Sequence, residues 1–387
     1  MNESFCVLPW LHIQTQPNGL AYPCCQYSYA SPIGDVTKNT LEEIANSKEI
    51  KLLRKNMMNG FKIEQCLECN KTSKDESNLR NEFNNFYKDI IPDLIKNTDL
   101  DGNYENWKLK FVNVRYSNLC NFACRTCGPD NSSLWAQENN QINPVVNITD
   151  KVPTYINDII RKLHEIDFIN FTGGESLLVD ENWKILDEII KQNLTHIKIT
   201  LITNLSKLQY KNRNLIEYAK KFKNFTIIVS LDSIGERANL YRHGTNWNVM
   251  ENNLKELVKN NINFHINVTI GAMNAWHFPD AEKYLYENNL IYPNAVVLTN
   301  LVYQRFLSTK ILPFEFKKEI VKKIEDHQVY LEEKKLNGKN WNSIKNYMLE
   351  EDHTFLLKNF IKFNKFLDKK RNENFLQVFP ELKSIIN

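Results

Sequence analysis

Alternating apolar and polar positions in the middle of the chain predict six β-strands. The predicted strands cover residues 109–116, 167–171, 197–203, 226–231, 264–270 and 295–301. Helical patterns lie between them, for example over residues 183–191, 215–222 and 249–259. This alternation of strand and helix predicts βαβ units and an α/β fold. Such a fold has a parallel sheet with functional groups at the carboxyl ends of its strands.

The two ends of the chain have different patterns. Residues 5–16 are strand-like, residues 17–19 form a strong turn signal, and residues 20–23 lead back, which predicts a hairpin. Thr40 and Glu43 form a capping-box pattern for a helix that ends near Gly60, and residues 73–96 form another helical pattern. Residues 97–103 have the composition of a linker, and residues 306–387 contain long amphipathic helical patterns. We therefore predict an N-terminal module over residues 1–104, a core over 105–305 and a helical extension over 306–387.

Composition and charge narrow the class of protein. The chain has 387 residues, of which 42% are hydrophobic, enough for a large buried core without disulfides. The net charge of +3 gives no electrostatic reason to expect nucleic acid or a membrane surface as the partner. The sequence contains no apolar run long enough to span a membrane and does not start like a signal peptide. We therefore expect a cytoplasmic protein with no membrane partner.

Three of the eight cysteines follow the first predicted strand of the core. Cys120, Cys124 and Cys127 are separated by three and two residues. Three thiolates this close in sequence can hold three corners of a cubic iron–sulfur cluster, which leaves the fourth iron without a cysteine. A structural zinc site usually has four protein ligands, so this group alone would be one ligand short.

The other five cysteines all lie in the N-terminal module. The predicted hairpin returns Cys24 toward Cys6, and Cys66 and Cys69 form a CxxC pair. These four thiolates suffice for a second, closed iron–sulfur cluster, although a zinc ribbon would use the same ligands. Cys25 is left over, as an alternative ligand, a proton or hydrogen-atom donor, or a small buried residue.

The spacing Cys120-x3-Cys124-x2-Cys127 resembles the signature of the radical S-adenosylmethionine enzymes. In that family, the amino and carboxylate groups of S-adenosylmethionine chelate the open iron of a 4Fe–4S cluster. The resemblance implies a partial (β/α)6 TIM-like barrel over about residues 105–305. It also implies two cofactors there, the 4Fe–4S cluster and S-adenosylmethionine.

Motifs at the predicted strand ends agree with this resemblance. Two glycines and a carboxylate end the second strand, and such glycines allow the backbone to approach a ligand closely. The motif matches the GGE motif of the family, which implies contact with the methionine amino group. The resemblance further implies contacts to the ribose hydroxyls and the methionine carboxylate from later strand ends, although an arginine there can equally form a surface ion pair. The predicted cofactor-binding residues are Gly173, Gly174, Glu175, Asn204, Ser230 and Arg242.

The N-terminal cysteines carry a second resemblance. The order Cys6-x12-Gly19-x4-Cys24, followed by Cys66-x2-Cys69, resembles the twitch module, a shortened relative of the SPASM domain. The resemblance implies one auxiliary 4Fe–4S cluster held by Cys6, Cys24, Cys66 and Cys69. In the best-known members this module follows the barrel, whereas here it precedes it.

Together, the resemblances imply an oxidoreductase or modifying enzyme. It would cleave S-adenosylmethionine reductively, form a 5′-deoxyadenosyl radical and abstract a substrate hydrogen. The auxiliary cluster would then help to oxidise or cross-link a peptide or small molecule. An external electron donor such as flavodoxin or ferredoxin is implied as a partner.

Two other classes of function remain open. One is radical modification of RNA or a nucleotide, for which the basic extension, with 16 Lys and Arg against 12 Asp and Glu, gives a weak reason. The other is a non-enzymatic zinc-binding adaptor.

Overall fold

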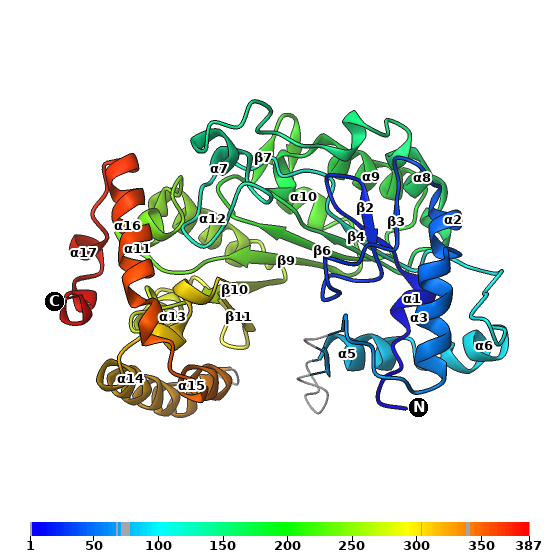
Figure 1. The fold of residues 1–387 in the computed structure, drawn as a ribbon. Helices are drawn as coiled ribbons and strands as arrows, with labels where there is room; N and C mark the ends of the chain where they lie inside the picture. The colour runs from blue at the N-terminus through cyan, green and yellow to red at the C-terminus, as the bar shows by residue number, and fades with distance from the viewer. Residues whose placement is uncertain (1, 67–68, 71–77, 303, 338–340, 387) are drawn as a thin grey trace. The chain divides into compact units, whose positions relative to one another are not determined.

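The computed structural model describes residues 2–66, 69–70, 78–302, 304–337 and 341–386. Figure 1 labels the helices and strands. The chain divides into two compact units. The first unit comprises Met1–Leu119, Val145–Thr200 and Phe222–Asn224, and the second comprises Cys120–Pro144, Leu201–Lys221 and Phe225–Asn387. The predicted boundaries of the three modules, after residues 104 and 305, stay predictions.

All six strands predicted for the core are present. They are β4 (Phe111–Val114), β5 (Phe168–Phe171), β6 (Lys198–Thr203), β9 (Phe225–Ser230), β10 (Phe264–Ile270) and β11 (Val297–Leu301). They form one six-stranded sheet in the order β11-β10-β9-β6-β5-β4, with parallel pairing between β4 and β5 and among β9, β10 and β11. This confirms the α/β class and the open, partial-barrel sheet. The division between the two units falls within β6.

In the first unit, the N-terminal hairpin lies beside β4. His12 forms a parallel bridge with Phe111, and its Nδ1 lies 2.8 Å from the Phe111 carbonyl oxygen. The Asn113 amide donates to Gln14 Oε1 at 3.0 Å. All four residues of β4 are buried, because a strand covered on both faces needs no polar side. The hairpin and the first core strands therefore share one packed region.

The N-terminal module is more helical than the sequence pattern predicts. Residues 5–16 are not one strand, because Leu8–Leu11 form a short helix, α1, and only Gln14–Thr15 form a strand, β1. Pro9 lies in the first turn of α1, where a missing N–H costs nothing and the fixed φ favours a helix. The predicted turn at Gly19 is present, with φ of +96°, and leads into β2 (Leu20–Tyr22) and then β3 (Gly34–Asp35).

The helix predicted from Thr40 to Gly60 is two helices. Thr40 and Glu43 form the predicted capping box at the start of α2 (Leu41–Ala45). A second helix, α3 (Lys48–Met58), then begins after Ser47, whose hydroxyl accepts the Ile50 N–H. The pattern over residues 73–96 forms α5 (Leu79–Phe86) and α6 (Ile91–Lys96), and residues 73–77 lie outside the described part of the chain. The first unit also contains α8 (Tyr155–Arg161) and α9 (Asp180–Lys191).

In the second unit, β9, β10 and β11 pair in register, with Ile266 opposite Val229 on one side and Val297 on the other. The connecting helices are α10 (Leu215–Ala219), α11 (Gly235–Tyr241), α12 (Trp247–Lys259) and α13 (Phe278–Glu287). Helix α7 (Ser133–Glu138) follows the loop of residues 120–127, which carries three cysteines and is called the cysteine loop below. Strands β7 (Gln209–Tyr210) and β8 (Arg213–Asn214) form a small hairpin. Helices between the core strands agree with the predicted alternation, although α7, α11 and α13 are not among the three helical stretches given as examples.

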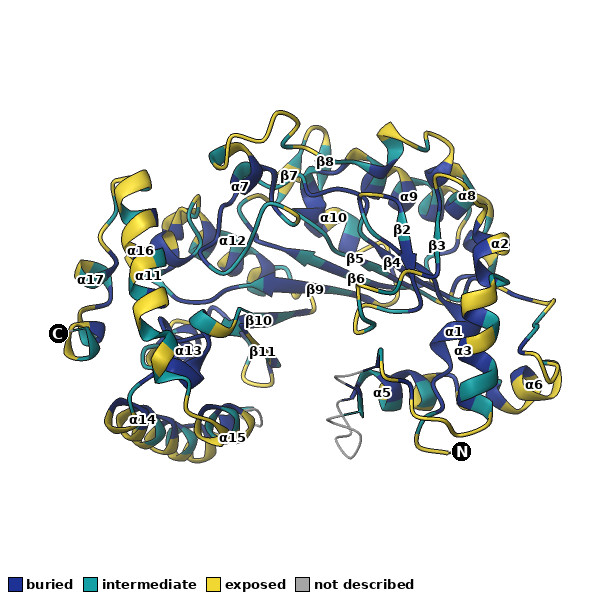
Figure 2. Ribbon diagram, in the orientation of Figure 1, coloured by how far each residue is buried: buried dark blue, intermediate teal, exposed yellow. Residues whose placement is uncertain are grey.

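The C-terminal extension is helical, as predicted. It contains α14 (Phe314–Glu333), α15 (Trp341–Glu350), α16 (Leu357–Arg371) and α17 (Phe375–Val378). Helix α16 buries Phe360, Asn364 and Leu367 on one face and exposes the opposite face (Figure 2). Within the described residues, no helix combines the length and apolarity that crossing a membrane requires.

Candidate iron–sulfur sites

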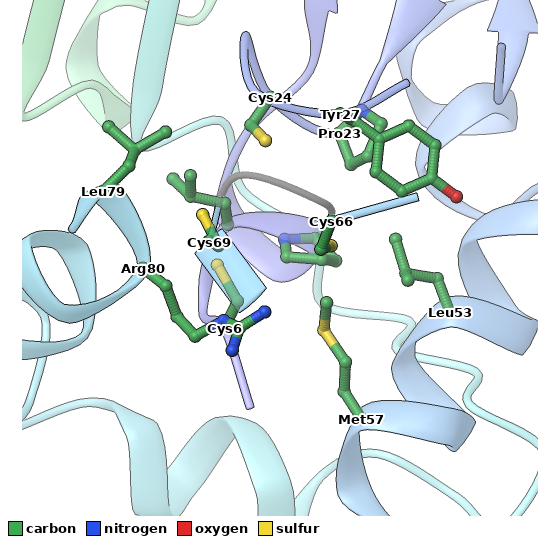
Figure 3. A pocket seen from close by; sticks show the side chains of 12 residues that line it. Cys6, Pro23, Cys24, Tyr27, Leu53, Met57, Cys66, Cys69, Leu79 and Arg80 are labelled. Carbon is green, nitrogen blue, oxygen red and sulfur yellow. The ribbon is translucent and has the colours of Figure 1, made fainter. Parts of the chain in front are cut away.

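A cavity in the N-terminal module brings together the four cysteines predicted to bind the auxiliary cluster. Cys6, Cys24, Cys66 and Cys69 line this cavity, which has about 330 Å³ of space, part of it open to solvent. Figure 3 shows these cysteine side chains around a common space. The chain folds them together because Cys6 precedes α1, Cys24 follows β2, and the CxxC pair follows α3.

The chemistry of this donor set fits an iron–sulfur cluster. The four thiols line one cavity, part of which is open to solvent. Soft thiolates around a common space are the ligands that a multi-iron cluster requires. Within the described residues, no three His, Cys, Asp or Glu side chains form a group that could hold a single metal ion.

Burial keeps the thiols of Cys6, Cys24 and Cys66 protonated when no metal is bound. It raises the pKa of Cys6 to about 12 and the pKa of Cys66 to about 11, and it raises the pKa of Cys24 well above its ordinary value. Because metal ligands must be thiolates, cluster binding at this site has to release protons.

Arg80 lines the same cavity, and the sequence analysis missed it. Its side chain is buried, and it donates to the Glu3 carbonyl oxygen at 2.6 Å and to Asn70 Oδ1 at 3.0 Å. Burial raises the pKa of Cys66, and the nearby Arg80 guanidinium opposes this rise. A buried cation beside four thiols would stabilise their thiolate form and a negatively charged cluster. No spacing rule in the sequence marks this arginine.

In the second unit, the loop of residues 120–127 holds the other three predicted ligands. Cys124 is buried, and Cys120 and Cys127 are partly exposed. The loop backbone is fixed on both sides of Cys124, because Ala123 N–H donates to the His243 carbonyl oxygen and Arg125 N–H donates to the Tyr241 carbonyl oxygen, both at 2.8 Å. The structure thus presents three thiols on one anchored loop, as the spacing predicts.

Arg242 belongs to a buried ion pair beside this loop. Its Nη1 donates to Asp232 Oδ2 at 2.8 Å, and Asp232 Oδ1 accepts the Thr269 N–H at 2.7 Å. The Asp232 side chain is 1% exposed and that of Arg242 is 13% exposed, so this is not a surface ion pair. Burial raises the pKa of the Cys124 thiol, and the charge of Arg242 opposes that rise. The guanidinium therefore acts on both Asp232 and Cys124, and its predicted contact with the methionine carboxylate stays a prediction.

Asn204 follows β6 and is hydrogen-bonded to the cysteine loop. Its amide donates to Asn121 Oδ1 at 2.9 Å, and its Oδ1 accepts the Ser206 N–H at 3.0 Å. Ser230 is the last residue of β9 and pairs with Asn267 of β10. Both residues lie at carboxyl ends of parallel strands in the same unit as the loop, as predicted, and their cofactor contacts stay predictions.

The Gly-Gly-Glu motif belongs to the first unit, where it follows β5. Gly173 has φ of +119°, and a Cβ on Gly174 would lie 2.3 Å from the Leu119 carbonyl oxygen. Glu175 N–H donates to that same oxygen at 2.8 Å. The glycines are therefore required for close approach to the backbone that precedes Cys120, a reason that the sequence analysis did not give. The Glu175 side chain is buried and caps the short helix Ser176–Leu178.

Family models match the two parts of the chain that contain the cysteines of these sites. Residues 114–285 match the model of the radical SAM superfamily, and residues 6–70 match the SPASM model, an iron–sulfur cluster-binding domain. The chain is therefore a member of the radical S-adenosylmethionine superfamily. Within it, the chain belongs to the members that carry a SPASM-type module, here on the N-terminal side, so 4Fe–4S clusters and S-adenosylmethionine are its cofactors.

Solved structures give weaker likenesses. The structure of anSMEcpe with bound AdoMet and the Cp18Cys peptide is 18% identical, with a TM-score of 0.43 over 63% of this chain and 67% of that chain. Streptococcus suis SuiB bound to S-adenosylmethionine is 13% identical, with a TM-score of 0.39 over 87% of this chain and 73% of that chain. Comparison with curated protein sequences gives no significant match.

Proposed function

We propose that this chain is a radical oxidoreductase that removes a hydrogen atom from a peptide and uses its auxiliary cluster to complete an oxidation or cross-link. Cys120, Cys124 and Cys127 hold the cluster that binds S-adenosylmethionine. When bound, that cluster and S-adenosylmethionine supply a 5′-deoxyadenosyl radical. Cys6, Cys24, Cys66 and Cys69 hold the auxiliary cluster.

The chain's own residues orient the cofactor and exclude water. Asp232 fixes the Arg242 guanidinium, and Asn121 fixes the Asn204 amide, so neither side chain has to reorganise when cofactor binds. Phe122 and Tyr241 are 1% exposed, so their side chains exclude water from the buried side of the cysteine loop. Gly173, Gly174, Glu175 and Ser230 complete the proposed cofactor-binding set.

The observation that carries the proposal is the cavity lined by four thiols in the N-terminal module. A complete set of four cysteine ligands leaves no open iron position, so a cluster there would transfer electrons and would not bind S-adenosylmethionine. Radical enzymes with such a module often modify peptides, which makes a peptide the proposed substrate class. An external one-electron donor such as flavodoxin or ferredoxin would supply the electron for each cleavage.

Iron and sulfide content after anaerobic reconstitution tests the proposal. We expect about eight irons in the native chain, and about four in a Cys120→Ala, Cys124→Ala, Cys127→Ala variant. The reduced native protein should form 5′-deoxyadenosine from S-adenosylmethionine, and the triple variant should not. A screen of peptides would then look for consumption coupled to this product.

Other outcomes separate the alternatives. About four irons falling to none in the triple variant would remove the auxiliary cluster and its electron-transfer role. If both sites bind zinc in place of iron and S-adenosylmethionine is not cleaved, the proposal of an enzyme is wrong and the zinc-binding adaptor is supported.

A further inference from the structure

A buried arginine lies inside the radical cluster motif itself. Arg125 directly follows Cys124, and its side chain is 1% exposed. The guanidinium donates to Asn364 Oδ1 at 2.9 Å, to Asp368 Oδ1 at 2.5 Å and to Glu373 Oε2 at 2.6 Å. A charge this deeply buried has to be paired and hydrogen-bonded, and here its three side-chain partners all come from the C-terminal extension.

The geometry of α16 places these partners together. Asn364 and Asp368 are four residues apart, so they lie on the same face of the helix. Asn372, with φ of +52°, ends α16 in a left-handed turn that brings Glu373 back over the helix end, where its N–H donates to the Asp368 carbonyl oxygen at 2.9 Å. The helix and its C-terminal turn thus form a receptor for one guanidinium.

Glu373 also connects this receptor to the other side of the cysteine loop. Its Oε1 lies 2.5 Å from His243 Nδ1. The His243 carbonyl oxygen accepts the N–H of Ala123 at 2.8 Å. Residues on both sides of Cys124 are therefore held through Glu373, one by a side chain and the other through the backbone of His243.

Apolar and cation–π packing adds a third connection. The Trp135 indole donates to the Cys124 carbonyl oxygen at 2.7 Å, and the Arg371 guanidinium lies 5.0 Å from the centre of its ring. Arg371 is itself held by Glu138 at 2.7 Å. Leu367 of α16 packs with Ala123 and Trp135 in a small buried cluster, against which Cys127 also lies.

We propose that α16 and its C-terminal turn are the positioning element of the radical cluster loop, and that Arg125 is the residue through which they act. The proposal rests on the proposed function, because it assumes that residues 120–127 hold the cluster. Three ligands must keep their geometry while the fourth iron exchanges cofactor, and residues that fix metal ligands from behind are what such a site needs. The C-terminal extension thus supports the catalytic site and does more than cap the fold.

The test compares Arg125→Gln with Arg237→Gln in the reconstituted full chain. Arg237 is a matched control, because it also forms a partly buried ion pair with the C-terminal extension, with Glu381 at 2.5 Å. Among the described residues, it forms no hydrogen bond or ion pair with the cysteine loop. We expect Arg125→Gln to release iron from the S-adenosylmethionine-dependent cluster about ten- to a hundredfold faster, the range typical of residues that support metal ligands. Arg237→Gln should release it at the native rate.

A spectroscopic readout separates positioning from general stability. S-adenosylmethionine should change the electron paramagnetic resonance spectrum of the reduced native protein and of Arg237→Gln. The change should be weakened in Arg125→Gln and partly restored in Arg125→Lys, which keeps the charge. Melting temperatures of the same samples show whether the two glutamine variants are equally destabilised.

Two results would overturn the proposal: native iron release with a native spectrum in Arg125→Gln, or equal losses in both glutamine variants. If Arg125→Gln does not fold, Glu373→Gln replaces it, because Arg125 then keeps Asp368 and Asn364, and the same two results decide. If the native chain binds no iron, the proposed function fails first, whatever the Arg125 variants do.

Discussion

In the N-terminal module, four thiols reach one cavity from three separated parts of the sequence, whereas the radical loop carries its three thiols within residues 120–127. The first set exists only once α1, β2 and α3 have packed. The second set exists in the sequence itself, but its anchors come from distant segments, Tyr241–His243 and α16. A closed site is thus built by tertiary structure, and an open site is local but depends on support from elsewhere.

The arginines beside the two sites differ in their hydrogen-bond partners. Among the described contacts, Arg80 donates to neutral oxygen atoms of Glu3 and Asn70. Arg125 and Arg242 beside the radical loop donate to the carboxylates of Asp368, Glu373 and Asp232. Within the described contacts, Arg80 thus has no carboxylate partner to offset its charge beside the thiols. Arg125 and Arg242 have carboxylate partners that fix their positions, and Arg242 still opposes the rise in the Cys124 pKa.

Matched CxxC variants give the largest expected effect and could break the comparison. Cys124→Ala, Cys127→Ala should abolish 5′-deoxyadenosine formation, because the loop would keep one thiol. Cys66→Ala, Cys69→Ala should keep that activity and lose peptide conversion, because only the auxiliary site is damaged. Each variant should hold about four of about eight irons.

Product analysis by liquid chromatography and iron assays check this pair. Loss of S-adenosylmethionine cleavage in both variants would mean that the two sites do not function independently. The comparison between a local and a tertiary site would then fail.

As the pH falls, buried His12 in the N-terminal hairpin should lower the free energy of unfolding before the carboxylate of Glu373 is protonated. Burial lowers the pKa of His12 from 6.5 to about 4. Below pH 6.5 the unfolded chain takes up a proton that folded His12 refuses, so the free energy of unfolding falls with pH. From pH 7 to 4 this one residue removes up to about 3 kcal/mol.

Urea unfolding of the native chain and His12→Gln at several pH values measures this effect. The variant should lose stability less steeply between pH 6.5 and 4. His277→Gln repeats the test in the second unit, since burial also lowers the pKa of His277 to about 4, and it should flatten the pH slope in the same way. Equal pH slopes in the native chain and His12→Gln would exclude the buried neutral imidazole as the cause.

The sequence predicted the sheet well because parallel strands covered on both faces leave a strong local pattern. Each predicted strand end lies within two residues of the observed end, and both ends of β10 were predicted as observed. The prediction of one strand over residues 5–16 was wrong, because Pro9 and buried side chains such as Trp10 favour a short helix there. The break between α2 and α3 was missed, because Ser47 acts as an N-cap inside an otherwise continuous helical pattern.

For the sites, spacing identified the thiols but not what surrounds them. Local spacing carries the chemistry of Cys120, Cys124 and Cys127. Arg125 is 243 positions from Asp368, its ion-pair partner, and no local pattern relates two residues that far apart. Arg80 was hidden for a similar reason, since an arginine in a helical pattern is ordinarily expected at the surface.

Gly174→Ala should have a smaller effect that sharpens the role of the Gly-Gly-Glu motif. The new Cβ would lie 2.3 Å from a backbone oxygen, so Leu119 or the motif has to move. We expect a loss of about 1–3 kcal/mol in stability together with weaker binding of S-adenosylmethionine. Gly128→Ala is the control, because its Cβ would meet no atom within 4 Å. Calorimetric titration with S-adenosylmethionine and thermal melts compare the two variants, and equal behaviour would show that the close approach at Gly174 is unimportant.

Glu373→Gln should have the smallest effect, and it tests whether the radical loop is held by charge. Burial raises the pKa of Glu373, but hydrogen bonds from His243 and Arg125 outweigh it and leave the pKa below its ordinary value of 4.5. The ionised carboxylate therefore stabilises the fold above pH 4.5, and this contribution disappears as the pH falls through the lowered value. At pH 7 the variant should lose about 1–2 kcal/mol, as for a hydrogen bond to a charged group, because Arg125 keeps its other partners. Urea unfolding should show this difference from the native chain unchanged between pH 7 and 5 and closing below pH 4.5, whereas the His12 effect has already developed above that pH. A difference that persists into acid would mean that Glu373 holds the loop by shape, and the contrast between a site built by burial and a site anchored by charge would lose its basis.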